Sequence, residues 1–255
     1  MGLAPADSKI IQIETMINID SQAQLLASIM AKKLSVGSKY ILIHIPYGKT
    51  AKVNKEEALK LKKKFEYLGK YFKRKLKVIL TETKGPFGNG VGPVLELIDV
   101  INILDPKKTG PKKLEKISLF LSSVLLEMGG KVKKGEGLKA ARGILESGQA
   151  FEKFREIIKA QKGSLNFNKL KPAKYKKDIF SGKSGKVIEI DNKKINNLAR
   201  IAGCPVDKFS GVYIYKLAGE KIHKKDKLLT VYSESKSRLK EAVDFCKKEK
   251  PILIK

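Results

Sequence analysis

The order of secondary structure is set in residues 40–82, which read YILIHIPYGKTAKVNKEEALKLKKKFEYLGKYFKRKLKVILTE. Short apolar runs at 40–46 and 76–82 are typical of strands that are buried on both faces. Between these runs, Asn54 is well placed to cap a helix that extends to about Lys73 and carries apolar residues at helical spacing. We expect the apolar side chains of this helix to face the core, namely Ala58, Leu61, Phe65, Leu68 and Phe72.

A loop and a helix follow each of these predicted strands. The first loop is GKTAKV (48–53), and the second is GPFGNGVGP (85–93), which leads into a helix over 94–104. This alternation predicts an α/β fold with a partial parallel sheet flanked by helices. Ligands of such sheets bind in loops beyond the carboxyl ends of the strands, so Lys52 is a candidate for binding an anion, although most loop lysines face solvent. The glycines of 88–92 match neither GxGxxG nor GxxxxGK(S/T), and a tight turn explains them.

The second half of the chain shows a different pattern of predicted secondary structure. Residues 112–161 show a helical pattern in three segments, whereas 166–178 has no clear period and is expected to be a linker. Short strands then alternate with helices at 192–202 and 235–248. We therefore expect 170–255 to form a separate small α+β domain.

Composition limits the class of protein. The chain of 255 residues is 42% hydrophobic, which is enough to bury the core of one or two domains. No apolar run approaches the roughly 20 residues of a membrane helix, and residues 1–30 lack the features of a secretory signal. Cys204 and Cys246 are far apart, and His44 and His223 are isolated. We therefore expect a cytoplasmic protein with no metal site and no membrane partner.

The formal net charge of +28 raises the question of nucleic-acid binding. The 54 basic residues are 49 lysines and 5 arginines, whereas proteins that read bases rely on the planar guanidinium group. The densest run, 60–77, has helical spacing with an apolar stripe, so a solvated helix face explains it more simply than an RNA groove. The charge therefore favours nonspecific adhesion, or attraction of phosphorylated ligands, over specific recognition.

Polar residues recur at every fourth position of the segment IDSQAQLLASIMAKKL (19–34). Asp20, Gln24, Ser28 and Lys32 therefore lie on one slanting stripe of the predicted helix. One interpretation is an amphipathic helix, with the acid and the lysine at the ends that the helix dipole favours. The alternative is that the stripe faces a ligand, and Ser28 supports it because its neighbours occupy core-like positions. The pattern alone favours the first interpretation.

Six segments, taken in order, carry a resemblance to one enzyme family. They are LAPAD (3–7), IDSQAQLLASIMAKK (19–33), PFGNGVGPVLE (86–96), LLEMGG (125–130), ILESGQAFEKFREIIKAQKG (144–163) and ARIAGCPVDKFSGVYIYKLAGEKIHKKDKLLTVYSES (199–235). The chain resembles the thymidine phosphorylase and AMP phosphorylase family, and most closely the AMP phosphorylase branch typical of archaea. The resemblance covers nearly every residue, so it is more specific than any single motif.

Members of this family cleave the N-glycosidic bond with phosphate, so the resemblance implies a pentosyltransferase with phosphate as co-substrate and no cofactor. In the AMP branch, AMP and phosphate give adenine and ribose 1,5-bisphosphate. By the same resemblance, Asp20 matches the residue proposed to protonate the leaving base, a role that needs a raised pKa. Ser28 and Lys52 match ligand-contacting positions, and Lys32 matches the lysine that holds the base in thymidine phosphorylases. On this resemblance the stripe faces the substrate.

Three positions depart from the family pattern. Ile13 takes the position of an arginine of the thymidine branch, which disfavours pyrimidine nucleosides but leaves a thymidine or pyrimidine nucleoside phosphorylase as the alternative. His44 stands where the family usually has an acid, and Thr50 stands where it usually has glycine. Because a β-branched residue avoids positive φ, we expect Thr50 to strain the loop that carries Lys52.

The resemblance also implies an incomplete enzyme, because the family's phosphate-binding segments precede LAPAD, where this sequence begins. Residues 1–36 would be a remnant of the helical lobe with the substrate helix, 37–165 an incomplete α/β core, and 170–255 a C-terminal domain of the pyrimidine nucleoside phosphorylase type. We expect a piece of a split enzyme or a truncated reading frame. Its expected partners are a nucleotide or nucleoside, phosphate, a separate chain with the phosphate-binding half, and a second copy of itself.

Two other interpretations remain open. In the first, the chain is a catalytically silent remnant that binds nucleotides or RNA through its lysines, and its RNA binding falls steeply with salt. In the second, the lysine excess reflects a genome-wide base composition and has no function.

Overall fold

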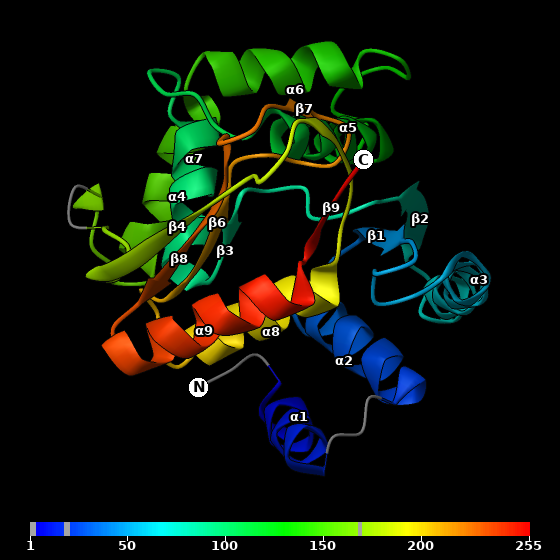
Figure 1. The fold of residues 1–255 in the computed structure, drawn as a ribbon. Coiled ribbons are helices and arrows are strands. Elements are labelled where there is room, and N and C mark those ends of the chain that lie inside the picture. The colour runs from blue at the N-terminus through cyan, green and yellow to red at the C-terminus, as the bar shows by residue number, and fades with distance from the viewer. Residues whose placement is uncertain (1–3, 18–20, 168–169) are drawn as a thin grey trace.

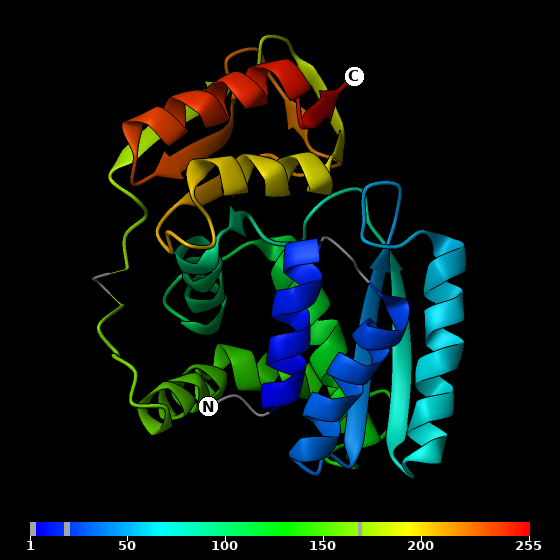
Figure 2. The same ribbon diagram turned by 90° about the horizontal axis from the view of Figure 1, so that it is seen from below.

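The computed structural model describes residues 4–17, 21–167 and 170–255, and its fold is α/β, as predicted (Figures 1 and 2). The helices are α1 (Pro5–Ile17), α2 (Gln22–Ser35), α3 (Lys55–Tyr71), α4 (Pro93–Leu104), α5 (Lys112–Met128), α6 (Gly137–Glu146), α7 (Gln149–Ala160), α8 (Asn192–Ala202) and α9 (Lys236–Glu249). The strands are β1 (Tyr40–Tyr47), β2 (Lys75–Glu82), β3 (Gly90–Val91), β4 (Tyr175–Phe180), β5 (Gly185–Ile190), β6 (Gly211–Ile214), β7 (Lys221–Ile222), β8 (Lys227–Ser233) and β9 (Ile252–Ile254). In the part of the chain that the structure describes, no helix has the length and apolar character needed to cross a bilayer.

β1 and β2 form a parallel pair over their full lengths, and α3 is the crossover between them. The helix begins after Asn54, whose side chain accepts a hydrogen bond from the backbone N–H of Glu57 at 3.0 Å. The carboxylate of Glu57 accepts a hydrogen bond from the backbone N–H of Asn54 at 2.8 Å, which completes a capping box. The strand–helix–strand order predicted from 40–82 is therefore confirmed.

The core of the N-terminal part lies between the β1–β2 sheet and the helices α2 and α3. Its buried residues are Met30, Ile41, Ile43, Ile45, Ala58, Leu61, Phe65 and Val78. Three of the five α3 side chains that we expected in the core are therefore fully buried, and Leu68 is partly buried. The prediction is wrong for Phe72, which is 39% exposed. α3 ends at Tyr71, so Phe72 leaves the inward helical face and packs edge-on against the ring of Tyr71 at 5.0 Å.

The C-terminal part holds two small sheets, and α8 and α9 lie side by side next to them (Figures 1 and 2). The first sheet has the strand order β3-β6-β8-β4, and the second has the order β7-β5-β9, with antiparallel pairs throughout. The linker prediction for 166–178 is wrong at its end, because β4 begins at Tyr175 and pairs with β8. β3 comes from the glycine-rich loop and pairs with β6, so this loop adds a strand to the C-terminal sheet.

Hydrogen bonds join the two parts near the carboxyl ends of β1 and β2. The backbone N–H of Ile190 donates to the carbonyl of Lys84 at 2.8 Å, and the hydroxyl of Thr50 donates to the carbonyl of Ile190 at 3.3 Å. The side-chain amide of Asn192 donates to the hydroxyl of Thr50 at 3.3 Å. The expected strain at Thr50 is wrong, because its φ is not positive; instead its hydroxyl ties the loop to β5.

The sequence predicted the helices of 112–161 but not the first helix, α1. The segment 112–161 contains α5, α6 and α7, as predicted. α1 was not expected, because no core-facing stripe marks it: Ile10, Ile13 and Met16 are exposed. A polar residue of α1, Asp7, is buried instead, with 7% of its surface exposed.

Candidate functional site

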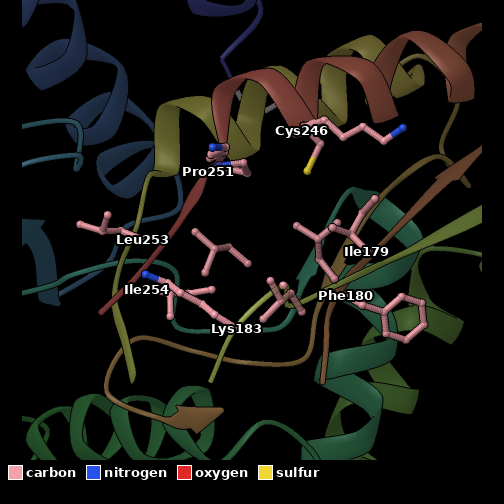
Figure 3. Close-up of a pocket in the computed structure, with 13 residues that line it drawn as sticks. Ile179, Phe180, Lys183, Cys246, Pro251, Leu253 and Ile254 are labelled. Atoms are coloured by element: carbon pink, nitrogen blue, oxygen red, sulfur yellow. The ribbon is translucent and has the colours of Figure 1, made fainter. Parts of the chain in front are cut away.

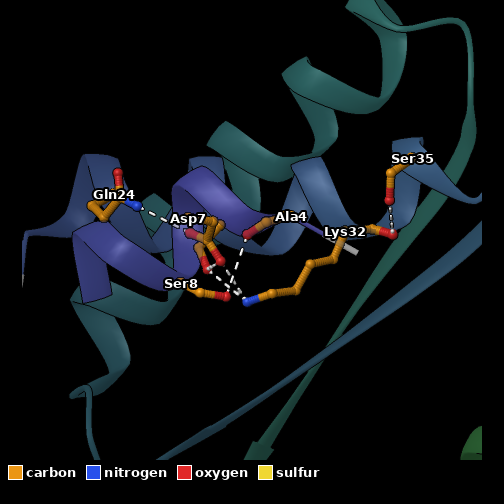
Figure 4. A network of polar contacts seen from close by, with 7 residues as sticks. Ala4, Asp7, Ser8, Gln24, Lys32 and Ser35 are labelled. Carbon is orange, nitrogen blue, oxygen red and sulfur yellow. Dashed lines mark hydrogen bonds and ion pairs between the residues drawn. The ribbon is translucent and has the colours of Figure 1, made fainter. Parts of the chain in front are cut away.

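The polar stripe of α2 faces α1 and surrounds the carboxylate of Asp7 (Figure 4). The side-chain amide of Gln24 donates to Oδ1 of Asp7 at 3.1 Å. The hydroxyl of Ser28 donates to Oδ2 of Asp7 at 2.9 Å, and Nζ of Lys32 lies 2.7 Å from the same oxygen. Nζ of Lys32 also donates to Oγ of Ser28 at 3.1 Å. We call Asp7, Gln24, Ser28 and Lys32 the Asp7 network.

Local sequence explains how α2 presents this network. The helix begins after Ser21, whose hydroxyl accepts a hydrogen bond from the backbone N–H of Gln24 at 3.4 Å. From this start, steps of four residues place Gln24, Ser28 and Lys32 on one face. Asp7 lies in the first turn of α1, where the helix dipole favours a negative charge.

The network holds an ionised carboxylate next to a partly open ammonium group. The hydrogen bond from Lys32 lowers the pKa of Asp7 below its ordinary value; burial opposes this, and Ser28 and Gln24 lower the pKa further. An ammonium group has three N–H donors, and two of them are directed at Asp7 and Ser28. Because the side chain of Lys32 is 43% exposed, its third N–H is available to an acceptor from outside the network.

Among the described residues, the structure brings the predicted site residues Ser28 and Lys32 together. Ser28 and Lys32 are in contact, whereas Lys52 lies in the loop beyond the carboxyl end of β1, as predicted, and is not a partner of Asp7 in the described contacts. That loop is closed by a hydrogen bond from the N–H of Gly48 to the carbonyl of Val53 at 3.1 Å. Asp20, the predicted proton donor, lies outside the described residues. The roles of all four residues stay predictions.

Sequence reasoning missed Asp7. It precedes Ser28 by 21 residues and lies on another helix, so no spacing rule connects the two. The available signal was the LAPAD segment, in which Asp7 is the one ionisable residue. Gln24, Ser28 and Lys32 therefore face neither bulk water nor an empty cleft, because the carboxylate of Asp7 on α1 lies against all three.

His44 is a structural residue of the sheet. Its Nε2 atom lies 3.0 Å from Oγ1 of Thr81 on β2, and its ring lies 5.8 Å from the ring of Phe87. Burial lowers the pKa of His44, so the ring is neutral at pH 7. Within the described ranges, no group of three or more His, Cys, Asp or Glu side chains is placed to hold a metal ion.

Cavities formed by the described residues lie away from the Asp7 network. One, of about 530 Å³, is lined mostly by apolar side chains of the C-terminal part, among them Ile179, Phe180 and Ile254 (Figure 3). Cys246 also lines it, and burial raises the pKa of this thiol to about 11, so it stays protonated and unreactive at neutral pH. Another cavity, of about 350 Å³, adjoins the carboxyl end of β2, and its lining mixes charged side chains with small and apolar residues. Neither is lined by Ser28, Lys32 or Lys52.

Comparison with known proteins assigns this arrangement to a family. A family model described as the pyrimidine nucleoside phosphorylase C-terminal domain matches residues 186–253. Over its full length the chain is 42% identical to the AMP phosphorylase of Methanococcus aeolicus and 44% identical to that of Pyrococcus abyssi. It is 38% identical to a Legionella pneumophila protein named "Putative thymidine phosphorylase". The chain belongs to the thymidine phosphorylase and AMP phosphorylase family.

The chain spans about half the length of the curated phosphorylases that it matches: 51% of the two AMP phosphorylases and 49% of the Legionella protein. The matched domain model begins in β5 and ends in β9. It leaves out β4, although β4 pairs with β8 inside the matched region. The Asp7 network lies outside that model, in a region where the chain is aligned with the longer phosphorylases.

Proposed function

We propose that this chain contributes one wall of the active site of a nucleotide phosphorylase, in which AMP and phosphate give adenine and ribose 1,5-bisphosphate. The observation that carries the proposal is the similarity to AMP phosphorylases along the whole chain, at 42% and 44% identity. Phosphate is the co-substrate, and the proposed reaction uses no cofactor.

The chemistry of phosphorolysis indicates what this wall must supply. Phosphate attacks C1′ of the ribose while the base leaves, so positive charge develops on the sugar and negative charge on the base. An acid that protonates the leaving base lowers the barrier, and Asp20 is our proposed donor. A carboxyl group in this role must stay protonated near neutral pH, which requires partial burial.

Ser28 and Lys32 are proposed to position the nucleotide. The remaining N–H of the Lys32 ammonium can donate to an acceptor on the base, and the Asp7 carboxylate fixes the direction of that ammonium. The loop that carries Lys52 lies beyond the carboxyl end of β1, where ligands of parallel sheets bind. Lys52 is therefore proposed to contact the anionic part of the ligand.

The same proposal includes a second polypeptide. Among the described residues the parallel sheet has two strands, whereas parallel sheets are usually larger and covered on both faces. We propose that a separate chain with the phosphate-binding half completes this sheet and the active site, and that a second copy of this chain is a further partner.

A reconstitution experiment tests this function. The chain is mixed with the half of the Methanococcus aeolicus AMP phosphorylase that it does not match, and adenine release from AMP is followed with and without phosphate. Phosphate-dependent adenine release that neither half gives alone supports the proposal. Thymidine in place of AMP tests the second candidate, a pyrimidine nucleoside phosphorylase, which the similarity to the Legionella protein favours.

A silent, lysine-rich binding module is the remaining alternative. It predicts no phosphorolysis after reconstitution, together with RNA binding that weakens steeply as salt is raised. Electrophoretic mobility shifts of a short RNA between about 50 and 200 mM salt distinguish this outcome, because the counterion effect spans orders of magnitude in that interval.

A further inference from the structure

The cavity of about 350 Å³ at the carboxyl end of β2 lies where the two parts of the chain meet. Its lining comes from four segments that are distant in sequence: the end of β2, the first turn of α5, β5, and the loop before β7. Three lysines line it, Lys84, Lys113 and Lys186, and the carboxylate-bearing residue of the lining is Glu82. The lining therefore carries a net positive charge.

The walls of this cavity are held by backbone hydrogen bonds. The carbonyl of Lys84 accepts a hydrogen bond from the N–H of Ile190 at 2.8 Å. On the opposite wall, the carbonyl of Val187 accepts from the N–H of Gly219 at 2.8 Å, and the N–H of Val187 donates to the carbonyl of Glu220 at 2.9 Å. These bonds fix the backbone at Lys84 and next to Lys186.

Lys113 is the lysine of this cavity whose surroundings favour binding of an anion. Its Nζ atom is 3.4 Å from the carbonyl oxygen of Pro86 and 5.3 Å from the centre of the Phe87 ring. Burial lowers the pKa of Lys113, and the charge of Glu220 opposes this effect. The carboxylate of Glu220 is itself engaged, because it accepts a hydrogen bond from the N–H of Leu217 at 2.8 Å. Within the described chain, no carboxylate forms an ion pair with Lys113.

We propose that this cavity binds a phosphate-type oxyanion between Lys84, Lys113 and Lys186. A half-buried ammonium group whose nearest partners are a carbonyl and an aromatic face lacks a full counter-charge, and an anion in the cavity supplies it. Three ammonium groups match a doubly charged phosphate better than a single carboxylate, and the volume is ample for orthophosphate. The position beyond the carboxyl end of β2 is also where anions bind in parallel sheets.

This site is independent of the Asp7 network and of the proposed reaction. The proposed function assigns its nucleotide contacts to Ser28, Lys32 and Lys52, so it does not require orthophosphate to bind in this cavity. The ligand is either free orthophosphate or the phosphate group of a nucleotide such as AMP. Both present the same chemistry to the lysines, and adenosine serves as the uncharged comparison.

Isothermal titration calorimetry of the full chain in a low-salt buffer tests the site, with orthophosphate, AMP and adenosine as separate titrants. We compare the wild type with Lys113→Gln and with Lys139→Gln, an exposed lysine of α6 that gives the same change of charge. Lys113→Gln should weaken orthophosphate binding by about tenfold or more, whereas Lys139→Gln should change it less than twofold.

The titrants distinguish the two sources of the anion. Loss of AMP binding in Lys113→Gln, with no binding of adenosine, assigns the site to nucleotide phosphates, whereas a loss confined to orthophosphate assigns it to the free anion. The proposal is overturned if Lys113→Gln weakens the binding of neither orthophosphate nor AMP, or if Lys113→Gln and Lys139→Gln weaken that binding equally. Neither result depends on phosphorolysis, so it leaves the proposed function to its own test.

Discussion

Nζ of Lys32 on α2 lies 2.7 Å from Oδ2 of Asp7 on α1, and this contact joins the two helices through a buried carboxylate. α1 leaves several of its apolar side chains exposed, including Ile13 and Ile17. The attachment of α1 therefore depends on polar contacts to α2 more than on apolar burial. The same contacts orient the two residues that we propose for nucleotide binding, Ser28 and Lys32.

The first prediction concerns the attachment of α1. Asp7→Asn removes the negative charge that Lys32 and Ser28 both contact. The helix α1 should therefore detach from α2 more often. Hydrogen exchange measured by mass spectrometry should become about tenfold faster in peptides from 5–17, with little change in α9. Asp244→Asn is the control, because that carboxylate is 62% exposed and its ion pair with Lys247 is long, at 4.0 Å. Equal exchange of α1 in Asp7→Asn and the wild type would show that the network does not hold this helix.

The second prediction concerns pH. The pKa of Asp7 in the folded protein lies below its ordinary value of 3.8 because of the Lys32 hydrogen bond. Because the pKa of Asp7 is lower in the folded state than in the unfolded state, its ionisation stabilises the folded protein. This stabilisation is complete above about pH 4 and is lost as the pH falls through the folded-state pKa. The difference in urea midpoint between the wild type and Asp7→Asn should therefore be constant from pH 7 to 5 and shrink below about pH 4. Asp178 and Asp226, whose pKa values are also lowered, occur in both proteins and cancel in the difference. A difference that stays constant to pH 2.5 contradicts this account.

The third prediction concerns the loop that carries Lys52. A Cβ atom on Gly48 would lie 2.2 Å from the carbonyl oxygen of Thr83, so Gly48→Ala must push β1 and the end of β2 apart. We expect a loss of about 1–3 kcal/mol in the free energy of unfolding, measured by urea denaturation. Gly182→Ala is the matched control, because its added Cβ meets nothing within 4 Å, and it should change stability by less than about 0.5 kcal/mol. Equal stability of the two variants would mean that the loop adapts freely.

The fourth prediction concerns the core beneath the parallel strands. Phe65 on α3 is 1% exposed, so Phe65→Ala should lower the free energy of unfolding by about 3–5 kcal/mol. Tyr67 lies two residues further on the same helix and is 67% exposed, so Tyr67→Ala should cost about 1 kcal/mol or less. Urea denaturation of both variants checks the pair. If both substitutions lowered the free energy of unfolding by similar amounts, Phe65 would not be a core residue of the N-terminal part.

The sequence predicted the elements that its periodicity marks directly. The apolar runs of β1 and β2, the capped helix α3 and the helices of 112–161 all correspond to observed elements, because each carries a core-facing pattern. α1 and β4 were missed for the same physical reason. Exposed isoleucines leave α1 without an inward stripe, and β4, YKKDIF, alternates too weakly to be distinguished from a linker. Phe72 was misplaced because the end of a helix is set by its cap, which a periodic pattern does not reveal.

The candidate site was predictable in part. The four-residue spacing placed Ser28 and Lys32 on one face, and the structure brings them into contact at 3.1 Å. The partner that fills this face, Asp7, was not predictable from spacing, because it comes from a different helix. The lysine-lined cavity was also beyond the reach of pattern analysis. Its lysines belong to three separate segments, and only tertiary contacts bring them together.

The central claim is that Ser28 and Lys32 of this chain hold a nucleotide for phosphorolysis once the other half of the enzyme is present. The most direct measurement uses a chimera, in which this chain replaces the matched half of the Methanococcus aeolicus AMP phosphorylase. We predict phosphate-dependent release of adenine from AMP, and a fall in kcat/KM of about 10-fold to 100-fold for Lys32→Ala and for Ser28→Ala. Lys139→Ala in the same chimera should retain full activity. A folded chimera that releases no adenine, or one whose kcat/KM is unchanged by both site substitutions, would contradict the claim.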